Sequence, residues 1–225
     1  MEGRRYGQGY GRVSQMSASA FMRAMALFTL VESLLVTIGA RMSYNSPASW
    51  ILLLLPFGIS LVCIWIFQSS KSPMVSGIGV AGMSLALGLM IGPFVKLYDV
   101  NIVLEAVVLT GAVMVVMSLL GMAFPSFFLG IGSFLIAGLV FLIVFGFGQI
   151  LLVAIGIHQA NSSGLNTFMA WAGIAIFSGL VAYDWVKALD GERTLDNAID
   201  ASGGLILDAV NLFLRILEIL GKSKK

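Results

Sequence analysis

Seven ionisable side chains stand inside long apolar stretches of this 225-residue chain, and their position calls for chemistry. They are Glu32, Glu105, Asp184, Asp200, Asp208, Arg215 and Glu218. An ionisable group at hydrocarbon depth is costly unless it faces protein, water or a partner, so such groups commonly mark ion routes or proton relays. These side chains are therefore the candidate functional residues of the sequence.

The last apolar stretch carries most of these groups on one side. At about 100° per residue, its polar positions and one glycine fall within a stripe roughly 80° wide. The stripe consists of Asn197, Asp200, Gly204, Asp208, Asn211, Arg215 and Glu218. We expect a helix in the middle of a bundle, with Asp200, Asn211 and Arg215 as candidates for an ion route. Two other interpretations are an amphipathic helix lying on the membrane, and an Arg215–Glu218 pair that only neutralises itself.

Asp184 and Asp208 are predicted to meet. Asp184 ends the sixth apolar stretch, and a short polar loop leads to the helix that carries Asp208. If the two helices are antiparallel neighbours, both carboxyl groups lie on the same side of the membrane, and two acids in a low-dielectric site share one proton. Such a pair serves as a pH-sensing latch, an oxygen-rich cation site or an acid/base dyad. Alternatively, the two acids only form hydrogen bonds to separate helices.

Two carboxyl groups lie elsewhere. Glu105 stands in the first turns of the fourth stretch, where the positive end of a helix favours a carboxylate. Glu32 is in the middle of the first stretch, has no basic residue one turn away, and is therefore either cavity-facing or protonated. No nucleotide-binding loop or serine nucleophile elbow occurs, and neither an enzyme nor a cofactor is expected.

The composition identifies the elements that must position these groups. Hydrophobic residues make up 59% and charged residues 11% of the chain, whereas soluble domains have about 45–50% and about 25%. Seven apolar stretches are long enough to cross a bilayer, at roughly 22–43, 49–67, 74–95, 102–122, 127–148, 165–187 and 198–220. The fifth reads on to Ile157, so its helix either tilts or ends near Gly146 and Gly148. We predict an all-α integral membrane protein, a seven-transmembrane-helix bundle with the C-terminal helix central; six crossings plus a re-entrant last segment is the alternative.

The predicted bundle occupies residues 21–221, between two basic tails. Residues 1–20 are expected to be a mobile, glycine-rich basic tail, and residues 222–225 a short basic one. The distribution of Lys and Arg favours a cytoplasmic N-terminus in a multi-pass protein. The net charge of +2 is too small for a nucleic-acid partner, and the lipid bilayer is the expected surrounding.

Small residues repeat at a spacing of four in the third stretch. They are Ser84, Gly88 and Gly92. Such a ridge lets two helix backbones approach closely in a membrane. We expect it to be a packing surface.

The closing residues resemble a known family. Tyr183-Asp184, a polar loop and then the run from Leu207 to Leu217, LDAVNLFLRIL, are similar to the C-terminal signature of the Bax inhibitor-1 family, the transmembrane BAX-inhibitor-motif proteins. Upstream, Gly92-Pro93 and Leu104-Glu105-Ala106 with Thr110 look like its third and fourth helices. The similarity spans about residues 20–220.

This resemblance implies a seven-helix bundle with the last helix at its centre and a pH-sensitive calcium leak. The aspartate pair of the family's pH sensor corresponds to Asp184 and Asp208. Calcium as the transported ion is implied only by the family, although carboxylate oxygens suit it. Some relatives carry an arginine cluster after the second helix that latches the pair. Here residues 68–72 offer only Lys71 as a latch, and lysine lacks the bidentate fork of arginine.

The leading hypothesis is a calcium leak channel gated by Asp184 and Asp208, with Glu105 or Glu32 lining the route. The first alternative is an intramembrane aspartyl protease, which also places Tyr-Asp on one helix and an aspartate on the next. Those proteases have Gly-x-Gly directly before the second aspartate, whereas here three residues separate Gly204 from Asp208, and no Pro-Ala-Leu occurs. The second alternative is a non-conducting regulator that binds other membrane proteins through its bundle surface.

Overall fold

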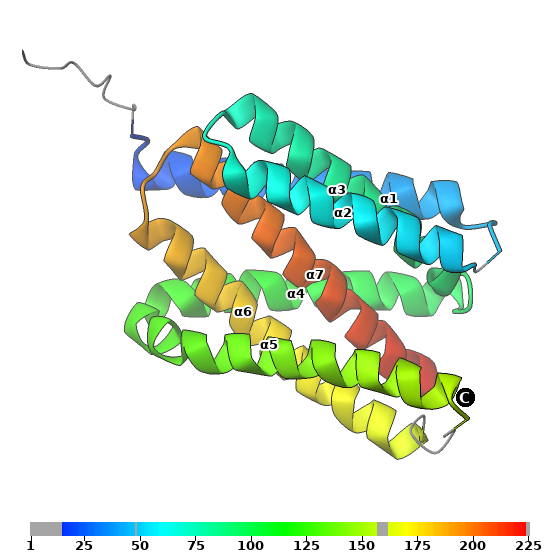
Figure 1. The fold of residues 1–225 in the computed structure, drawn as a ribbon. Helices are drawn as coiled ribbons and strands as arrows, with labels where there is room; N and C mark the ends of the chain where they lie inside the picture. Colours follow the sequence, from blue (N-terminus) through cyan, green and yellow to red (C-terminus); the bar gives the residue numbers. More distant parts are fainter. Residues whose placement is uncertain (1–14, 48, 157–161, 224–225) are drawn as a thin grey trace, which may run out of the picture.

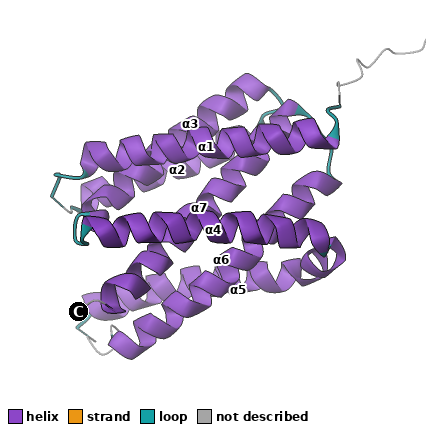
Figure 2. Ribbon diagram, turned by 180° about the vertical axis from the view of Figure 1, so that it is seen from behind, coloured by secondary structure: helices purple, strands orange, loops and turns teal. Residues whose placement is uncertain are grey.

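The computed structural model describes residues 15–47, 49–156 and 162–223, and this part of the chain forms seven helices without a strand (Figures 1 and 2). The helices are α1 (Ala18–Ser43), α2 (Trp50–Ser69), α3 (Pro73–Val95), α4 (Val100–Ala123), α5 (Pro125–Ala154), α6 (Ser163–Asp190) and α7 (Leu195–Ser223). Each of the seven predicted stretches is confirmed as a helix, with ends that differ by a few residues. Most of the predicted N-terminal tail and the end of the C-terminal tail lie outside the described residues.

Capping residues and prolines stand at the starts of five of the helices. The side chains of Ser17, Ser49 and Asp99 each accept a backbone N–H in the first turn of α1, α2 and α4. Proline is the first residue of both α3 and α5, where its missing N–H costs nothing. Local turn residues therefore fix where α1 to α5 start.

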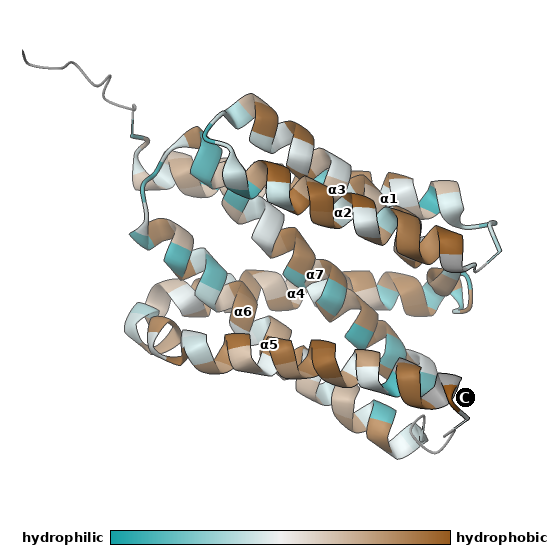
Figure 3. Cartoon of the chain, viewed as in Figure 1, coloured by the Kyte–Doolittle hydropathy of each residue, from teal (hydrophilic) through white to brown (hydrophobic). Residues whose placement is uncertain are grey.

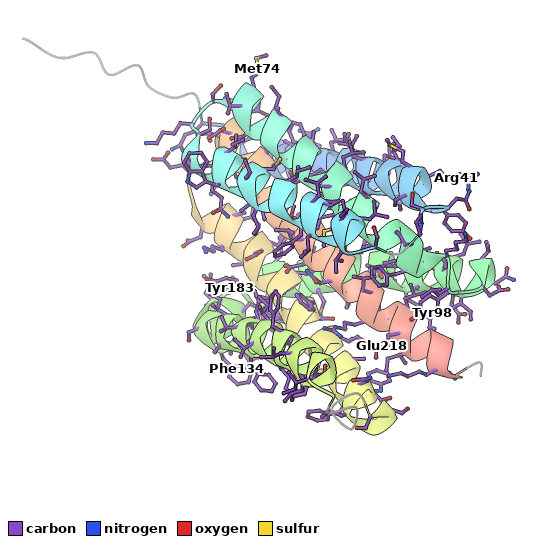
Figure 4. The ribbon with its side chains drawn as sticks, turned by 45° about the vertical axis from the view of Figure 1, so that its right-hand side comes forward. Arg41, Met74, Tyr98, Phe134, Tyr183 and Glu218 are labelled. Atoms are coloured by element: carbon purple, nitrogen blue, oxygen red, sulfur yellow. The ribbon has the colours of Figure 1, made fainter. Side chains whose placement is uncertain are left out.

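Six helices, α1 to α6, are long and apolar enough to cross a membrane. Their outward faces are apolar, as in Phe134 of α5, which is 73% exposed (Figures 3 and 4). Helix α5 runs on to Ala154, so the predicted alternative of an end near Gly146 and Gly148 is wrong. Its 30 residues extend about 45 Å, which exceeds a hydrocarbon core of about 30 Å. These features make the chain a multi-pass membrane protein.

Helices α1 and α3 pack backbone against backbone. A Cβ atom built on Gly88 would overlap the carbonyl oxygen of Val36, and one on Gly92 would overlap that of Ala40. From the other side, a Cβ on Gly39 would overlap the carbonyl oxygen of Leu85. The predicted packing ridge on α3 is therefore confirmed, with α1 as its partner.

The helices group into two units that both contact α7. Helices α1 and α2 pack on α3 and form the α1–α3 unit, whereas α4 and α5 pack on α6 and form the α4–α6 unit. Helix α7 contacts α1 and α3 of the first unit and α4 and α6 of the second (Figure 1). The largest direct contact between the two units is a small one between α1 and α6. Along α7, no side chain from Asp196 to Lys222 is exposed.

Candidate functional site

The α6–α7 interface brings Asp184 and Asp208 together. The two helices form an extensive contact after a short connection. Asp208 is 7% exposed, and Asp184 lies close enough for a charge on it to act on the Asp208 carboxyl group. Gly204, one turn before Asp208, makes the approach possible, because a Cβ there would lie only 3.2 Å from Asp184 Oδ2. The polar stripe of α7 thus faces α6 at this level.

The Asp208 carboxyl group is incompletely paired. Its Oδ2 atom is buried and has no hydrogen-bond partner within the described part of the chain. A buried carboxylate oxygen without a donor is costly. A proton on one of the two acids removes one charge and supplies a donor, so the arrangement suits a pair that holds one proton between two carboxyl groups.

A cavity of about 360 Å³ lies beside Asp184. Both α6 and α7 line it, together with the end of α2, and its polar side chains are Gln68, Asp184, Lys187, Glu192, Asn197 and Asp200. The backbone N–H of Met16 donates to the carbonyl oxygen of Arg193 (2.8 Å), so the segment before α1 lies beside the α6–α7 connection. Asp184 therefore borders this cavity, whereas the buried Asp208 does not line it.

Polar contacts also join α7 to the α1–α3 unit. Ser76 of α3 donates a hydrogen bond to Asp196 Oδ1 (2.8 Å). Glu32 of α1 is 3% exposed, and its Oε1 lies 2.5 Å from Ser202 Oγ on α7. Glu32 does not line the cavity beside Asp184, and Glu105 stands in the first turns of α4 with an exposed side chain. The structure therefore places Glu32 and Glu105 apart from the aspartate pair.

The far end of α7 holds a small charge network. Glu218 accepts from Lys222 Nζ (2.8 Å) and pairs with Arg215 Nη1 (3.5 Å). Lys222 also donates to Thr167 Oγ1 of α6 (3.3 Å). Asn211 donates to the Leu207 carbonyl oxygen of its own helix (2.8 Å). Arg215 and Asn211 thus have partners within α7, and Arg215 shares Glu218 with Lys222.

The lysine near Asp184 is Lys187, whereas Lys71, the latch candidate from the sequence, lies elsewhere. Lys71 is exposed at the α2–α3 connection and does not line the cavity. Lys187 lines it, its charge acts on Asp184, and its Nζ lies 5.4 Å from the ring centroid of Tyr183. The spacing of three residues between Asp184 and Lys187 was the available signal, because such residues are neighbours on a helix.

Calcium would find few ligands in this site. No group of three or more His, Cys, Asp or Glu side chains among the described residues is arranged to hold a metal ion. Ca²⁺ takes about six to eight oxygen ligands, more than the two carboxyl groups of Asp184 and Asp208 supply.

Glu218 is expected to influence Tyr98 of the α3–α4 connection, which lies near it at the far end of α7 (Figure 4). Burial, and secondly the charge of Glu218, raise the pKa of Tyr98 above 10.0. Glu218→Gln should therefore lower this pKa while leaving it above the ordinary value, because the negative charge that opposes the phenolate is gone and burial remains. Ultraviolet titration, with Tyr98→Phe to assign the signal, measures the shift. Glu192→Gln, at the other end of the bundle, is the matched control; an unshifted Tyr98 titration in Glu218→Gln contradicts the prediction.

Comparisons with known proteins agree with this architecture. The family model described as Inhibitor of apoptosis-promoting Bax1 matches residues 18–225. An uncharacterized protein of Borreliella burgdorferi is 27% identical over 207 residues, which cover 88% of this chain and 85% of the relative. Bax inhibitor 1 of Schizosaccharomyces pombe is 27% identical over 210 residues, 90% of this chain and 76% of the relative. The Golgi anti-apoptotic protein of Vaccinia virus (strain Lister) is 29% identical over 146 residues, 65% of this chain and 58% of the viral protein.

The match extends from the start of α1 to the end of the chain and includes both helices that carry the aspartate pair. Two relatives align over most of their own length. The chain therefore belongs to the Bax inhibitor-1 family.

Proposed function

We propose that this protein is a transmembrane calcium leak channel whose opening depends on the protonation of Asp184 and Asp208. The observation that carries the proposal is the buried Asp208 carboxyl group, which faces the charge of Asp184 and has an oxygen without a donor. Protonation changes the net charge of this pair, and a charge change inside a bundle shifts the balance between two helix arrangements. Ca²⁺ is the proposed transported ion, moving down its gradient.

The proposal places α7 as a seventh, central crossing. Its support is that α7 contacts four other helices and exposes no side chain between Asp196 and Lys222. A helix lying on a membrane surface would instead turn its polar stripe to water. In this arrangement the N-terminus is cytoplasmic, and the cavity beside Asp184 opens toward the same side.

The proposed ion route follows the α6–α7 interface. Asp200 and Asn197 line the cavity at one end, and Arg215 and Glu218 stand at the other end of the same stripe. Asp184 and Asp208 lie between these ends. Their ionisation state would set whether a cation meets attraction or a neutral barrier at mid-route.

Calcium flux into liposomes tests this function. Purified protein is reconstituted with an entrapped calcium indicator, and the initial rate of calcium entry is measured over a series of pH values, with protein-free liposomes as the reference. We expect entry above the reference that varies with pH, while an entrapped large dye stays inside. Entry equal to that of protein-free liposomes at every pH would overturn the proposal.

A second candidate is a non-conducting regulator of another membrane protein. It is favoured by the descriptions of the matched family and of the viral relative, which name inhibition of apoptosis rather than transport. A stoichiometric membrane partner that co-purifies with a protein lacking ion flux would select this function. The liposome assay can include a membrane-embedded peptide reporter, whose cleavage would instead revive the aspartyl protease.

A further inference from the structure

Glu32 and Ser202 form a buried polar contact that the aspartate pair does not involve. Glu32 lies in the middle of α1 and is 3% exposed, and Ser202 of α7 is fully buried. Their oxygens, Oε1 and Oγ, are 2.5 Å apart. The distance is that of a strong O–H···O hydrogen bond. One of the two groups must supply its proton.

Counting protons identifies the donor. Ser202 Oγ also lies 2.7 Å from the carbonyl oxygen of Ile199, which can only accept. A hydroxyl group has a single proton. If Ser202 gives it to Ile199, then Glu32 must carry a proton and donate to Ser202. Both short contacts are then satisfied, whereas an ionised Glu32 would compete with Ile199 for one proton.

The second oxygen of Glu32 supports the same assignment. Glu32 Oε2 is buried and has no hydrogen-bond partner among the described residues. In a carboxylate this atom would carry half of a buried negative charge without a donor, which is costly. In a neutral acid it is an unpaired carbonyl oxygen, which is far less costly.

Among the described residues, no Lys or Arg forms an ion pair with Glu32. On α1 itself, Arg23 and Arg41 are each nine residues away, about 13 Å along the axis. Helix α3, the main partner of α1, has no titratable side chain. The polar group that acts on Glu32 is the Ser202 hydroxyl.

The other helices that pack on α1 are α6 and α7. Their titratable groups are Tyr183, Asp184, Lys187, Asp190, Asp196, Asp200, Asp208, Arg215, Glu218 and Lys222. Asp208 interacts with Asp184, Asp196 with Ser76, and Glu218 with Arg215 and Lys222. These contacts are made with α3, with α6 or within α7, and Asp200 and Lys187 line the cavity beside Asp184, which Glu32 does not line.

We propose that Glu32 is a neutral carboxylic acid that donates its proton to Ser202 Oγ, and that it forms a proton-binding site joining α1 to α7. This site is separate from Asp184 and Asp208 and does not depend on ion conduction. It contributes to holding α7 against the α1–α3 unit. Loss of the Glu32 proton leaves a buried carboxylate against Ser202 and weakens the α1–α7 contact.

Infrared spectroscopy of the full-length protein in lipid tests this assignment at neutral pH. A protonated carboxylic acid has a carbonyl stretching band distinct from those of carboxylates and amides. We expect such a band in the wild type, its loss in Glu32→Gln, and its shift in Ser202→Ala, where the acceptor of the hydrogen bond is absent. Asp208→Asn serves as the control and leaves the Glu32 band in place. Identical acid-band regions in wild type and Glu32→Gln would overturn the proposal.

Thermal unfolding against pH provides a second readout. As the pH rises, the wild-type unfolding midpoint should fall over the range in which the Glu32 band disappears. The Glu32→Gln variant, whose amide N–H₂ still donates to Ser202, should not show this fall. Ser202→Ala supplies the comparison if Glu32→Gln does not fold. A midpoint that falls equally in wild type and Glu32→Gln would also overturn the proposal.

Discussion

Asp208→Asn is expected to abolish the pH dependence of calcium entry that belongs to the aspartate pair. Asparagine keeps the size and shape of the side chain but does not ionise, so the proton that we propose Asp184 and Asp208 share has no second carboxyl group to bind it. The ratio of ionised to neutral acid in the wild type changes about tenfold per pH unit on either side of its midpoint. The variant should lack that change in entry rate over the same pH range.

The measurement is the initial rate of calcium entry into liposomes at matched protein content. Asp190→Asn is the matched control, because it makes the same chemical change on an exposed residue at the end of α6. It should retain the wild-type profile. A wild-type pH profile in Asp208→Asn would exclude the sensor role of the pair even if calcium entry itself persists.

Alanine at Gly88 and at Gly77, both on α3, is expected to change stability in opposite directions. A Cβ at Gly88 would overlap the Val36 carbonyl oxygen and lie 2.9 Å from the Cα of Gly39, and these backbone atoms of α1 cannot move aside alone. Helices α1 and α3 must then separate, at a cost of about 1–3 kcal/mol or more. A Cβ at Gly77 has nothing within 4 Å, so the better helix propensity of alanine should stabilise the protein by up to about 1 kcal/mol.

Thermal unfolding in a mild detergent measures both variants against the wild type. Because each replaces glycine by alanine within one helix, the difference between them isolates the contact with α1. A Gly88→Ala protein as stable as Gly77→Ala would show that α1 and α3 are not held backbone to backbone.

The sequence predicts the helices well because each is a continuous apolar run bounded by turn residues. The ends of α3, 73 and 95, lie within one residue of the expected 74–95. The end of helix α5 was harder to predict, because glycine at 146 and 148 weakens helices in water but is tolerated in a membrane. Local turn residues therefore place most helix starts and ends within a few residues, and the largest error is the end of α5.

The candidate site was predictable where its residues are close along the chain. Asp184 and Asp208 lie on two helices joined by one short connection, so antiparallel packing brings them to neighbouring levels of the α6–α7 interface. The partner of Glu32 was not predictable, because Ser202 is 170 positions away. The sequence of α1 does not indicate which helix packs against Glu32. Lys71 was predicted as a latch for the aspartate pair because it follows α2. Lys187 lines the cavity instead, because it lies one turn from Asp184 on the same helix.

The grouping of the helices into two units limits how this molecule can change shape. Each unit has its own dense contacts, and the two units meet mainly through α7. A rigid-body rotation of one unit against the other preserves the packing inside both and alters chiefly the two surfaces of α7. Spin-label distances within the α1–α3 unit should therefore stay constant during such a motion, while distances between α1 and α5 report it directly.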